Sequence, residues 1–192
     1  MRFECCVETL ESAHAAVKGG GCRRLELCAA LAEGGTTPSF GLFKLVRDSF
    51  PTVFVGCLVR PRGGDFYYSE KEVCAMLVDI DLFKRHGANG VVLGALDLNG
   101  AIHLSHMRRL ISAARPMEVT FHRAIDVCRD PLHTVRECVA LGVNRILSSG
   151  GESNALAGSA TLAKMVCEAD NRLMVCAGGG ITPDNCLEIS NS

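Results

Sequence analysis

Two cysteines of this chain, Cys6 and Cys28, each follow a glutamate by two residues, in the segments 4–6 and 26–28. Side chains alternate along a β-strand, so each segment in a strand places its carboxylate and its thiol on one face. Neighbouring strands lie about 4.8 Å apart, and thiols at equivalent places on two such strands could share one soft metal ion. The alternative is a pair of buried thiols beside a polar site. Cys5 is expected to face the opposite side, toward covering helices.

The chain contains eleven cysteines, an odd number, and no two of them are spaced as Cys-x-x-Cys. This pattern argues against a disulfide framework and against a zinc-ribbon spacing. Most of these thiols are expected to be small core residues, a role that free cysteine often fills. Cys57, Cys176 and Cys186 are the weaker alternates as metal ligands.

A second group of reactive side chains is charged. Arg60 or Arg62 could hold a carboxylate or a phosphate through two parallel hydrogen bonds, and His122 could act as acid or base because its unperturbed pKa is about 6.5. Glycines at 63–64 and 178–180 could offer backbone N–H groups to the anion, although tight turns explain them equally well. In an enzyme, the expected catalytic residues are His122, Arg123 and Asp126, and the expected anion-binding residues are Glu4, Glu26, Arg60, Arg62, Asp65, Gly179 and Gly180. A buried ion-pair network is the structural alternative.

The elements that must position these residues alternate in type. Short apolar runs predict strands at 3–7, 24–28, 52–60, 90–94, 118–121, 145–149 and 172–177. Segments of helical period lie between them at 9–18, 41–48, 70–86, 104–114, 131–141 and 162–169. Ser69, Asp130 and Thr182 mark expected helix starts, and Gly87 and Gly142 follow expected helix ends. Nearly continuous apolar runs are typical of parallel strands buried on both faces.

This alternation fits an open doubly wound sheet or a TIM-type barrel. The open sheet of a dinucleotide-binding protein needs Gly-x-Gly-x-x-Gly after the first strand, and Val-Glu-Thr-Leu at 7–10 does not provide it. The barrel needs polar residues just past the C-terminal ends of its strands, which is where the charged groups fall. We therefore predict an α/β fold, a single TIM-type (β/α) barrel domain over 1–192. The segment 182–192 is a helix start that stops, so we expect this barrel to lack its eighth unit and to be incomplete at the C-terminus, with about seven strands.

Composition excludes several classes of function. The chain has 20 basic and 21 acidic residues, a net charge of −1 and no basic cluster, which argues against nucleic-acid and membrane-surface partners. No apolar run approaches the roughly 18 residues that span a bilayer, and the first residues leave no room for a signal peptide. We expect a cytoplasmic protein, with the nucleus as a second compartment, that forms homo-oligomers because open strand edges associate.

Several segments resemble the CutC family, whose members are named for copper homeostasis. They are Glu-Cys-Cys-Val-Glu-Thr at 4–9, Arg-Leu-Glu-Leu-Cys at 24–28, Leu-Ala-Glu-Gly-Gly-Thr-Thr-Pro-Ser at 31–39, Arg-Pro-Arg-Gly-Gly-Asp-Phe at 60–66, Thr-Phe-His-Arg-Ala-Ile-Asp at 120–126, Ser-Ser-Gly at 148–150 and Gly-Gly-Gly-Ile-Thr at 178–182. The resemblance runs from about residue 3 to about residue 186, and the segments 60–66 and 120–126 are its most specific parts. It implies a TIM-type barrel, whose last unit this sequence lacks.

The resemblance also implies copper as a partner. In the family, cysteines at the two matching positions are the proposed Cu(I) ligands, and this role carries over to Cys6 and Cys28. Three hypotheses follow. The favoured one is a copper-binding homeostasis protein with Cu(I) on these two thiols; the second is a barrel enzyme acting on a small anionic metabolite; the third is a truncated product that associates through its exposed strand edges.

Overall fold

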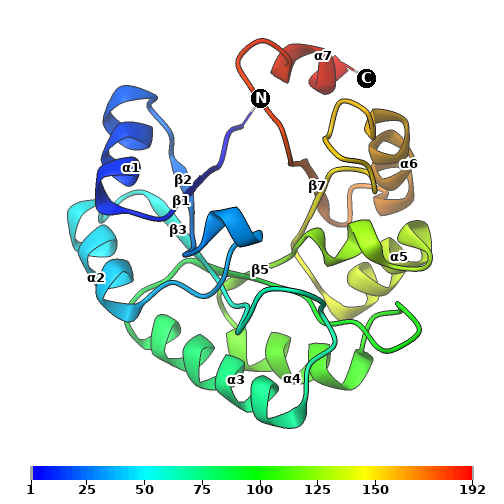
Figure 1. Ribbon diagram of the computed structural model, residues 1–192, viewed down its shortest axis with the longest axis horizontal. Coiled ribbons are helices and arrows are strands. Elements are labelled where there is room, and N and C mark those ends of the chain that lie inside the picture. The colour runs from blue at the N-terminus through cyan, green and yellow to red at the C-terminus, as the bar shows by residue number, and fades with distance from the viewer. Residues whose placement is uncertain (1, 192) are drawn as a thin grey trace. The chain divides into compact units, whose positions relative to one another are not determined.

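The computed structural model describes residues 2–191, and within them seven β-strands alternate with helices along the chain (Figure 1). The strands are β1 Cys5–Val7, β2 Arg24–Leu27, β3 Phe54–Leu58, β4 Gly90–Leu93, β5 Glu118–Phe121, β6 Arg145–Ser148 and β7 Met174–Ala177. Each coincides with a predicted strand, and no strand end differs from its predicted position by more than two residues. The predicted alternation of elements is confirmed.

The helices also follow the predicted pattern. The α-helices are α1 Leu10–His14, α2 Phe40–Ser49, α3 Glu70–Arg85, α4 Leu104–Ala114, α5 Pro131–Leu141, α6 Ser159–Ala169 and α7 Cys186–Asn191. The segment after α1 continues as a π-helix, η1 Ala15–Gly19, and two 3₁₀ helices lie at η2 Leu31–Glu33 and η3 Arg123–Val127. The expected helix start at Thr182 is wrong: residues 183–185 form turns, and α7 begins at Cys186.

The chain divides into two compact units. The first extends to Leu93 and includes Arg109–Glu118, and the second comprises Gly94–Arg108 and the described chain from Val119 onward. In the first unit β1 pairs with β2, β2 with β3 and β3 with β4, all in parallel. In the second unit β5 pairs with β6 and β6 with β7, also in parallel. Parallel neighbours need a crossover connection, and the intervening helices supply it.

Local sequence explains where the helices begin and end. Ser69 caps α3 by accepting the Glu72 N–H, while the Glu72 carboxylate accepts the Ser69 N–H, a reciprocal capping box. Asp130 caps α5 ahead of Pro131, whose ring fixes the first helical φ. Gly142 ends α5 with φ of +75°, a left-handed conformation that glycine adopts without steric cost.

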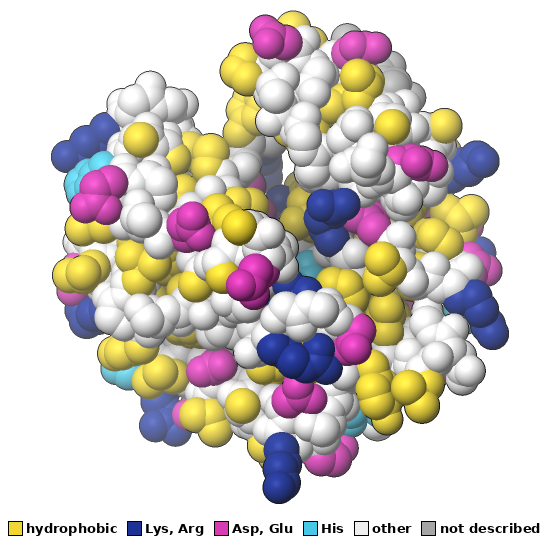
Figure 2. Space-filling view, viewed as in Figure 1, with side chains coloured by type: hydrophobic (Ala, Val, Ile, Leu, Met, Phe, Trp, Pro, Cys, Tyr) yellow, Lys and Arg dark blue, Asp and Glu magenta, His cyan; other side chains and the backbone are white. Residues whose placement is uncertain are grey.

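A buried cluster of the first unit connects the candidate thiol Cys28 with strands β3 and β4. Leu58 on β3 is opposite Val92 on β4, and Cys28 joins them in one buried cluster. Strands β3 and β4 are buried on both faces, as their continuous apolar sequences predict. On the visible surface, acidic and basic side chains are interspersed (Figure 2), in keeping with the net charge of −1.

Candidate functional site

The predicted thiol pair lies on the first two strands of the first unit. The register pairs Cys6 with Glu26, and Cys28 lies two residues beyond Glu26. The Cys28 N–H donates to the Val7 carbonyl oxygen at 3.0 Å, so the strand pairing continues to Cys28. Because alternate side chains share a face, Cys6, Glu26 and Cys28 all lie on one face. Cys28 lies two residues beyond the position paired with Cys6, so the expectation that the two thiols occupy equivalent places on the strands is wrong.

The two thiols differ in exposure and share an acidic neighbour. Cys6 keeps solvent access, whereas Cys28 is fully buried. Burial, reinforced by the negative charge of Glu26, raises the pKa of Cys28 to about 12. Desolvation by the surrounding chain, with the charges of Glu26 and Cys28 added, also raises the pKa of Cys6. Both groups are therefore neutral thiols at pH 7, and each must release its proton before it can act as a thiolate ligand.

The two glutamates of the Glu-x-Cys segments have different surroundings. Glu26 is buried in the middle of the β1–β2 pairing, with only 6% of its surface exposed. Glu4 accepts a hydrogen bond from Nε of Arg24 at 3.0 Å, and Arg24 also reaches Glu118 at 2.5 Å. Glu4 thus belongs to an ion-pair cluster at the N-terminal ends of the strands. Of these two carboxylates, Glu26 is the one paired in register with a candidate thiol.

Arg60 follows β3, and its side chain is buried. Nη1 donates to the carbonyl oxygens of Glu33 at 3.1 Å and Gly35 at 2.8 Å, and Nη2 donates to that of Gly64 at 2.7 Å. These acceptors lie on the loop after β2 and the loop after β3. Arg60 therefore clamps two loops of the first unit together through neutral acceptors.

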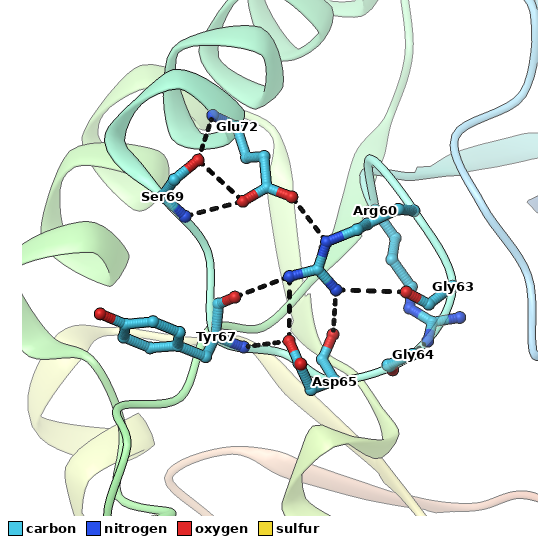
Figure 3. Close-up of polar contacts among 8 residues, drawn as sticks. Arg60, Gly63, Gly64, Asp65, Tyr67, Ser69 and Glu72 are labelled. Carbon is cyan, nitrogen blue, oxygen red and sulfur yellow. Dashed lines mark hydrogen bonds and ion pairs between the residues drawn. The ribbon is translucent and has the colours of Figure 1, made fainter.

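Arg62 organises the loop between β3 and α3; its partners Asp65, Tyr67 and Glu72 are labelled in Figure 3. Nε donates to Glu72 at 2.6 Å, Nη1 to the carbonyl oxygens of Gly63 and Asp65 at 3.2 Å, and Nη2 to the Asp65 carboxylate at 2.9 Å and the Tyr67 carbonyl oxygen at 2.8 Å. These contacts use all five N–H groups of a guanidinium. Hydrogen bonds to Asp65 and Glu72 raise the pKa of Arg62. Arg62 and Asp65 therefore hold the loop itself.

Asp126 is the centre of a polar cluster in the second unit. Its carboxylate accepts hydrogen bonds from the Ser148 hydroxyl at 2.5 Å, from the Ser149 N–H and hydroxyl at 3.0 Å, and from the Gly151 N–H at 3.2 Å. Nε of Arg123 forms an ion pair with it at 2.8 Å. Burial alone would raise the pKa of Asp126, but these donors outweigh burial and hold the pKa below its ordinary value.

Arg123 brings the loops after β6 and β7 together. Nη2 donates to the Ser149 hydroxyl at 2.9 Å, and 44% of the Arg123 side chain remains exposed. A methyl group on Gly179 would lie 3.4 Å from Cζ and Nη1 of Arg123, so the guanidinium rests against this glycine. Gly179 and Gly180 have φ of +98° and +68°, a region that favours glycine. The predicted anion-binding residue Gly179 and Arg123 are therefore neighbours in the second unit, whereas Gly180 lies beside Asn154.

His122 is buried, with 5% of its surface exposed. Its Nδ1 accepts the Ala124 N–H at 3.2 Å and so caps η3. In this hydrogen-bonding arrangement the proton of a neutral ring is assigned to Nε2. The ring lies close to Gly94, where a Cβ atom would come within 2.8 Å of it, so glycine at that position makes room for the imidazole.

Sequence reasoning missed two residues that build these clusters. Glu72 was given no role in the sequence analysis, yet it binds Arg62. Ser149 was placed at the end of a strand without a role, yet it contacts both Arg123 and Asp126. A serine or glutamate directly after a strand or a helix start is the signal that could have singled them out.

Comparison with known proteins identifies the family. The CutC family model matches residues 1–192. The chain belongs to the CutC family. A CutC family protein of Bacteroides thetaiotaomicron is 44% identical over 190 residues, which cover 99% of this chain and 76% of that relative. The family predicted from the sequence segments is confirmed.

Solved structures confirm the fold of this CutC chain. A structure of a CutC copper homeostasis protein from Streptococcus agalactiae matches with a TM-score of 0.92 and 31% identity, covering 100% of this chain and 94% of that one. An aldolase called QR15 matches with a TM-score of 0.64 and 14% identity, covering 98% and 85%, and it supports the fold alone. The fold is a TIM-type (β/α) barrel, with seven of the usual eight strands in the described residues.

Residues 2–191 hold neither a larger cluster of metal-binding side chains nor a membrane-spanning helix. No group of three or more His, Cys, Asp or Glu side chains in this part of the CutC chain is arranged to hold a metal ion. None of the described helices is both long and apolar enough to cross a membrane.

Proposed function

We propose that this CutC chain binds Cu(I) as cargo through the thiolates of Cys6 and Cys28, in the service of copper homeostasis. The observation that carries the proposal is the placement of the two cysteines on one face of neighbouring strands, one exposed and one buried, with Glu26 beside them. The name of the S. agalactiae relative, a copper homeostasis protein, supports copper as the cargo.

The donor set suits Cu(I) better than a harder cation. Cu(I) is soft, prefers thiolate ligands and accepts a low coordination number, so two sulfurs suffice. A structural zinc site, in contrast, takes four ligands, and the described residues do not assemble such a set. The carboxylate of Glu26 adds negative charge beside the sulfurs and attracts an entering cation.

The two cysteines have different parts in loading. Cys6 keeps solvent access, so it is the first to meet a copper donor. Cys28 is held in place by its buried apolar neighbours and by the contact of its thiol with the Val7 carbonyl oxygen at 3.6 Å. Loading releases the protons of both thiols to solvent. Because the eleven cysteines are free thiols, we assign this activity to the cytoplasm, where thiols stay reduced.

An anaerobic Cu(I) titration against a competing chelator tests the proposal. We compare the native chain with the Cys6→Ser/Cys28→Ser variant and with a matched control, Cys74→Ser/Cys167→Ser, which removes two exposed thiols. The expected result is loss of one tightly bound ion in the first variant alone. Equal binding by all three proteins would refute the assignment.

A second candidate function, binding of a small anionic metabolite, has support from Arg123. This guanidinium uses Nε and Nη2 within the protein, is 44% exposed, and rests against Gly179. Its outward N–H groups and the backbone of the glycine loop are suited to a phosphate or carboxylate. Buried His122 directly precedes Arg123 and is the candidate acid or base.

Calorimetric titration with inorganic phosphate tests this second function. Arg123→Gln removes the charge but keeps hydrogen-bonding groups, and losing a charge-assisted contact should weaken binding roughly 30-fold or more. Arg129→Gln, which removes another exposed arginine of the second unit, is the control. Phosphate affinity that is the same in both variants and the native chain would reject the anion site.

A further inference from the structure

Arg60 is a buried positive charge that, among the described residues, pairs with no carboxylate. Its guanidinium donates to the carbonyl oxygens of Glu33, Gly35 and Gly64, which are neutral acceptors. These contacts use three of the five N–H groups of an arginine, and within residues 2–191 the buried Nε–H finds no hydrogen-bond acceptor. Burying a charge costs free energy unless an opposite charge compensates it. Arg60 therefore has both the charge and the donor that attract an anion.

The acidic side chains around the same loop belong to the neighbouring arginine. Arg62 forms ion pairs with Asp65 at 2.9 Å and with Glu72 at 2.6 Å. Two carboxylates thus compensate one guanidinium, whereas Arg60, two residues earlier, receives backbone oxygens. This distribution leaves the positive charge of Arg60 without compensation from the acids of its own loop.

A second buried donor lies at the other end of this loop. Tyr68 is 1% exposed, and its hydroxyl finds no hydrogen-bond partner in the part of the chain that the structure describes. Residues 61–67, between the two ends, are all at least partly exposed. The loop folds back on its start: Cζ of Arg60 lies 5.0 Å from the centroid of the Phe66 ring, and Cζ of Arg62 lies 5.4 Å from that of the Tyr68 ring. The fold of the loop thus brings the buried phenol toward the arginines that begin it.

The Tyr68 phenol keeps its proton at neutral pH. Burial raises its pKa to about 12, although the positive charge of Arg60 opposes that rise. A buried donor that lacks an acceptor destabilises the folded chain. Arg60 and Tyr68 thus present two buried donors, one N–H and one O–H, whose hydrogen bonds an anion can complete.

We propose that Arg60 and Tyr68 bind the carboxylate group of a small carboxylic acid, one oxygen accepting from the Arg60 Nε–H and the other from the Tyr68 hydroxyl. A single negative charge matches the single charge of the guanidinium. The cost of desolvating an ion grows with the square of its charge, so a monoanion enters a buried site more readily than a dianionic phosphate. A carboxylate also has one oxygen for each donor, whereas a halide has a single centre.

This site lies entirely within the first unit, on the loop between β3 and α3. The inference therefore rests neither on copper binding by Cys6 and Cys28 nor on the anion site proposed at Arg123 in the second unit.

Urea unfolding in the presence of formate, the smallest carboxylate, tests the inference. Buffers of equal ionic strength contain either formate or methanesulfonate, a bulkier monoanion that is not a carboxylate. Binding to the folded chain should raise the urea midpoint by about 0.7 M for each tenfold increase in formate above the dissociation constant, because each such increase changes the folding equilibrium about tenfold. Methanesulfonate should leave the midpoint unchanged, and an equal response to chloride would overturn the assignment to a carboxylate.

Tyr68→Phe removes only the hydroxyl and separates binding from folding. Without formate this variant should be at least as stable as the native chain, because it loses a buried donor that has no partner. Its affinity for formate should fall roughly tenfold or more, since a charge-assisted hydrogen bond is lost. Tyr67→Phe is the matched control, because Tyr67 is 44% exposed, and it should keep the native response. Arg60→Gln, which removes the charge, should abolish the response.

The ¹⁵N resonance of the Arg60 Nε–H group reports the contact directly. It should shift when formate is added to the native chain and stay in place when methanesulfonate is added. An unchanged resonance with equal midpoints in the two salts would overturn the inference, and so would a full response to formate in Tyr68→Phe. The same shift should occur in Arg123→Gln, so failure of this inference is distinguishable from failure of the anion site at Arg123.

Discussion

The Asp126 cluster offers the strongest test of the energetics inferred for the second unit. Asp126→Asn replaces a carboxylate that accepts hydrogen bonds from Ser148, Ser149, Gly151 and Arg123. An asparagine keeps one acceptor oxygen but turns an NH₂ group toward donors. Hydrogen bonds to a charged group are worth about 1.5–3 kcal/mol each, and partial retention of the contacts leaves an expected loss of about 3 kcal/mol in the free energy of unfolding.

The pH dependence of this loss has a definite sign. The native pKa of Asp126 is depressed, so the folded state holds a proton on this group less readily than the unfolded state, whose aspartate pKa is about 3.9. The stabilisation is therefore complete above that unfolded value and is lost as pH falls through the native pKa. The difference between the native chain and the variant should be constant from about pH 5 to 7 and shrink below about pH 4.

Urea unfolding, followed by circular dichroism, measures the effect. With a slope of about 2 kcal/mol per molar urea, the midpoint should fall by about 1.5 M at pH 7. Asp48→Asn is the matched control, because Asp48 is 58% exposed and pairs with Lys44 on its own helix; its cost should stay below about 0.5 kcal/mol. A midpoint shift in Asp126→Asn no larger than that of the control would refute the reasoning.

Three further predictions follow from the first unit. Arg60→Met leaves three carbonyl oxygens without their donor, so the free energy of unfolding measured in urea should fall by about 3 kcal/mol. A decrease below about 1 kcal/mol would contradict the role of Arg60 as a clamp between the two loops. Gly35→Ala places a side chain at φ of +86° and its Cβ 2.7 Å from buried Leu58, so the free energy of unfolding should fall by about 2–4 kcal/mol. The control Gly41→Ala, within α2, should leave the free energy of unfolding unchanged. Equal urea midpoints for the two variants would be inconsistent with this geometry. The Cu(I) affinity should rise roughly a hundredfold per pH unit between pH 6 and 8, as measured by chelator competition. The reason is that Cys28, with a pKa of about 12, and Cys6 must each lose a proton to bind the ion. A flat profile would mean that these thiols are not the ligands.

The strands were predictable because their apolar runs are continuous and bounded by glycine or capping residues. Even β5, at Glu118–Phe121, was found at its observed bounds. The helix after β1 was less accessible: its first turn at Leu10–His14 is α-helical, but Ala15–Gly19 adopts a π-helix, a change that hydrophobic period does not encode. The start of α7 was misplaced because a Thr-Pro pair can open a turn as readily as a helix.

The candidate site was predicted as a set of residues and not as a set of contacts. The contacts of a side chain depend on the register of the strands. The matching Glu-x-Cys motifs suggested that Cys6 lies opposite Cys28, but the register pairs Cys6 with Glu26. The sequence also did not show that the hydrogen-bond donors of Arg62 are all used within its own loop, whereas the guanidinium of Arg123 stays partly exposed.

The most direct test of the account is the copper stoichiometry of the Cys6→Ser/Cys28→Ser variant beside the native chain, measured anaerobically against a chelator that removes weakly held Cu(I). We expect the variant to lose one tight ion and the Cys74→Ser/Cys167→Ser control to lose none. Native-like copper binding by the folded variant would contradict the central claim that Cys6 and Cys28 carry the cargo.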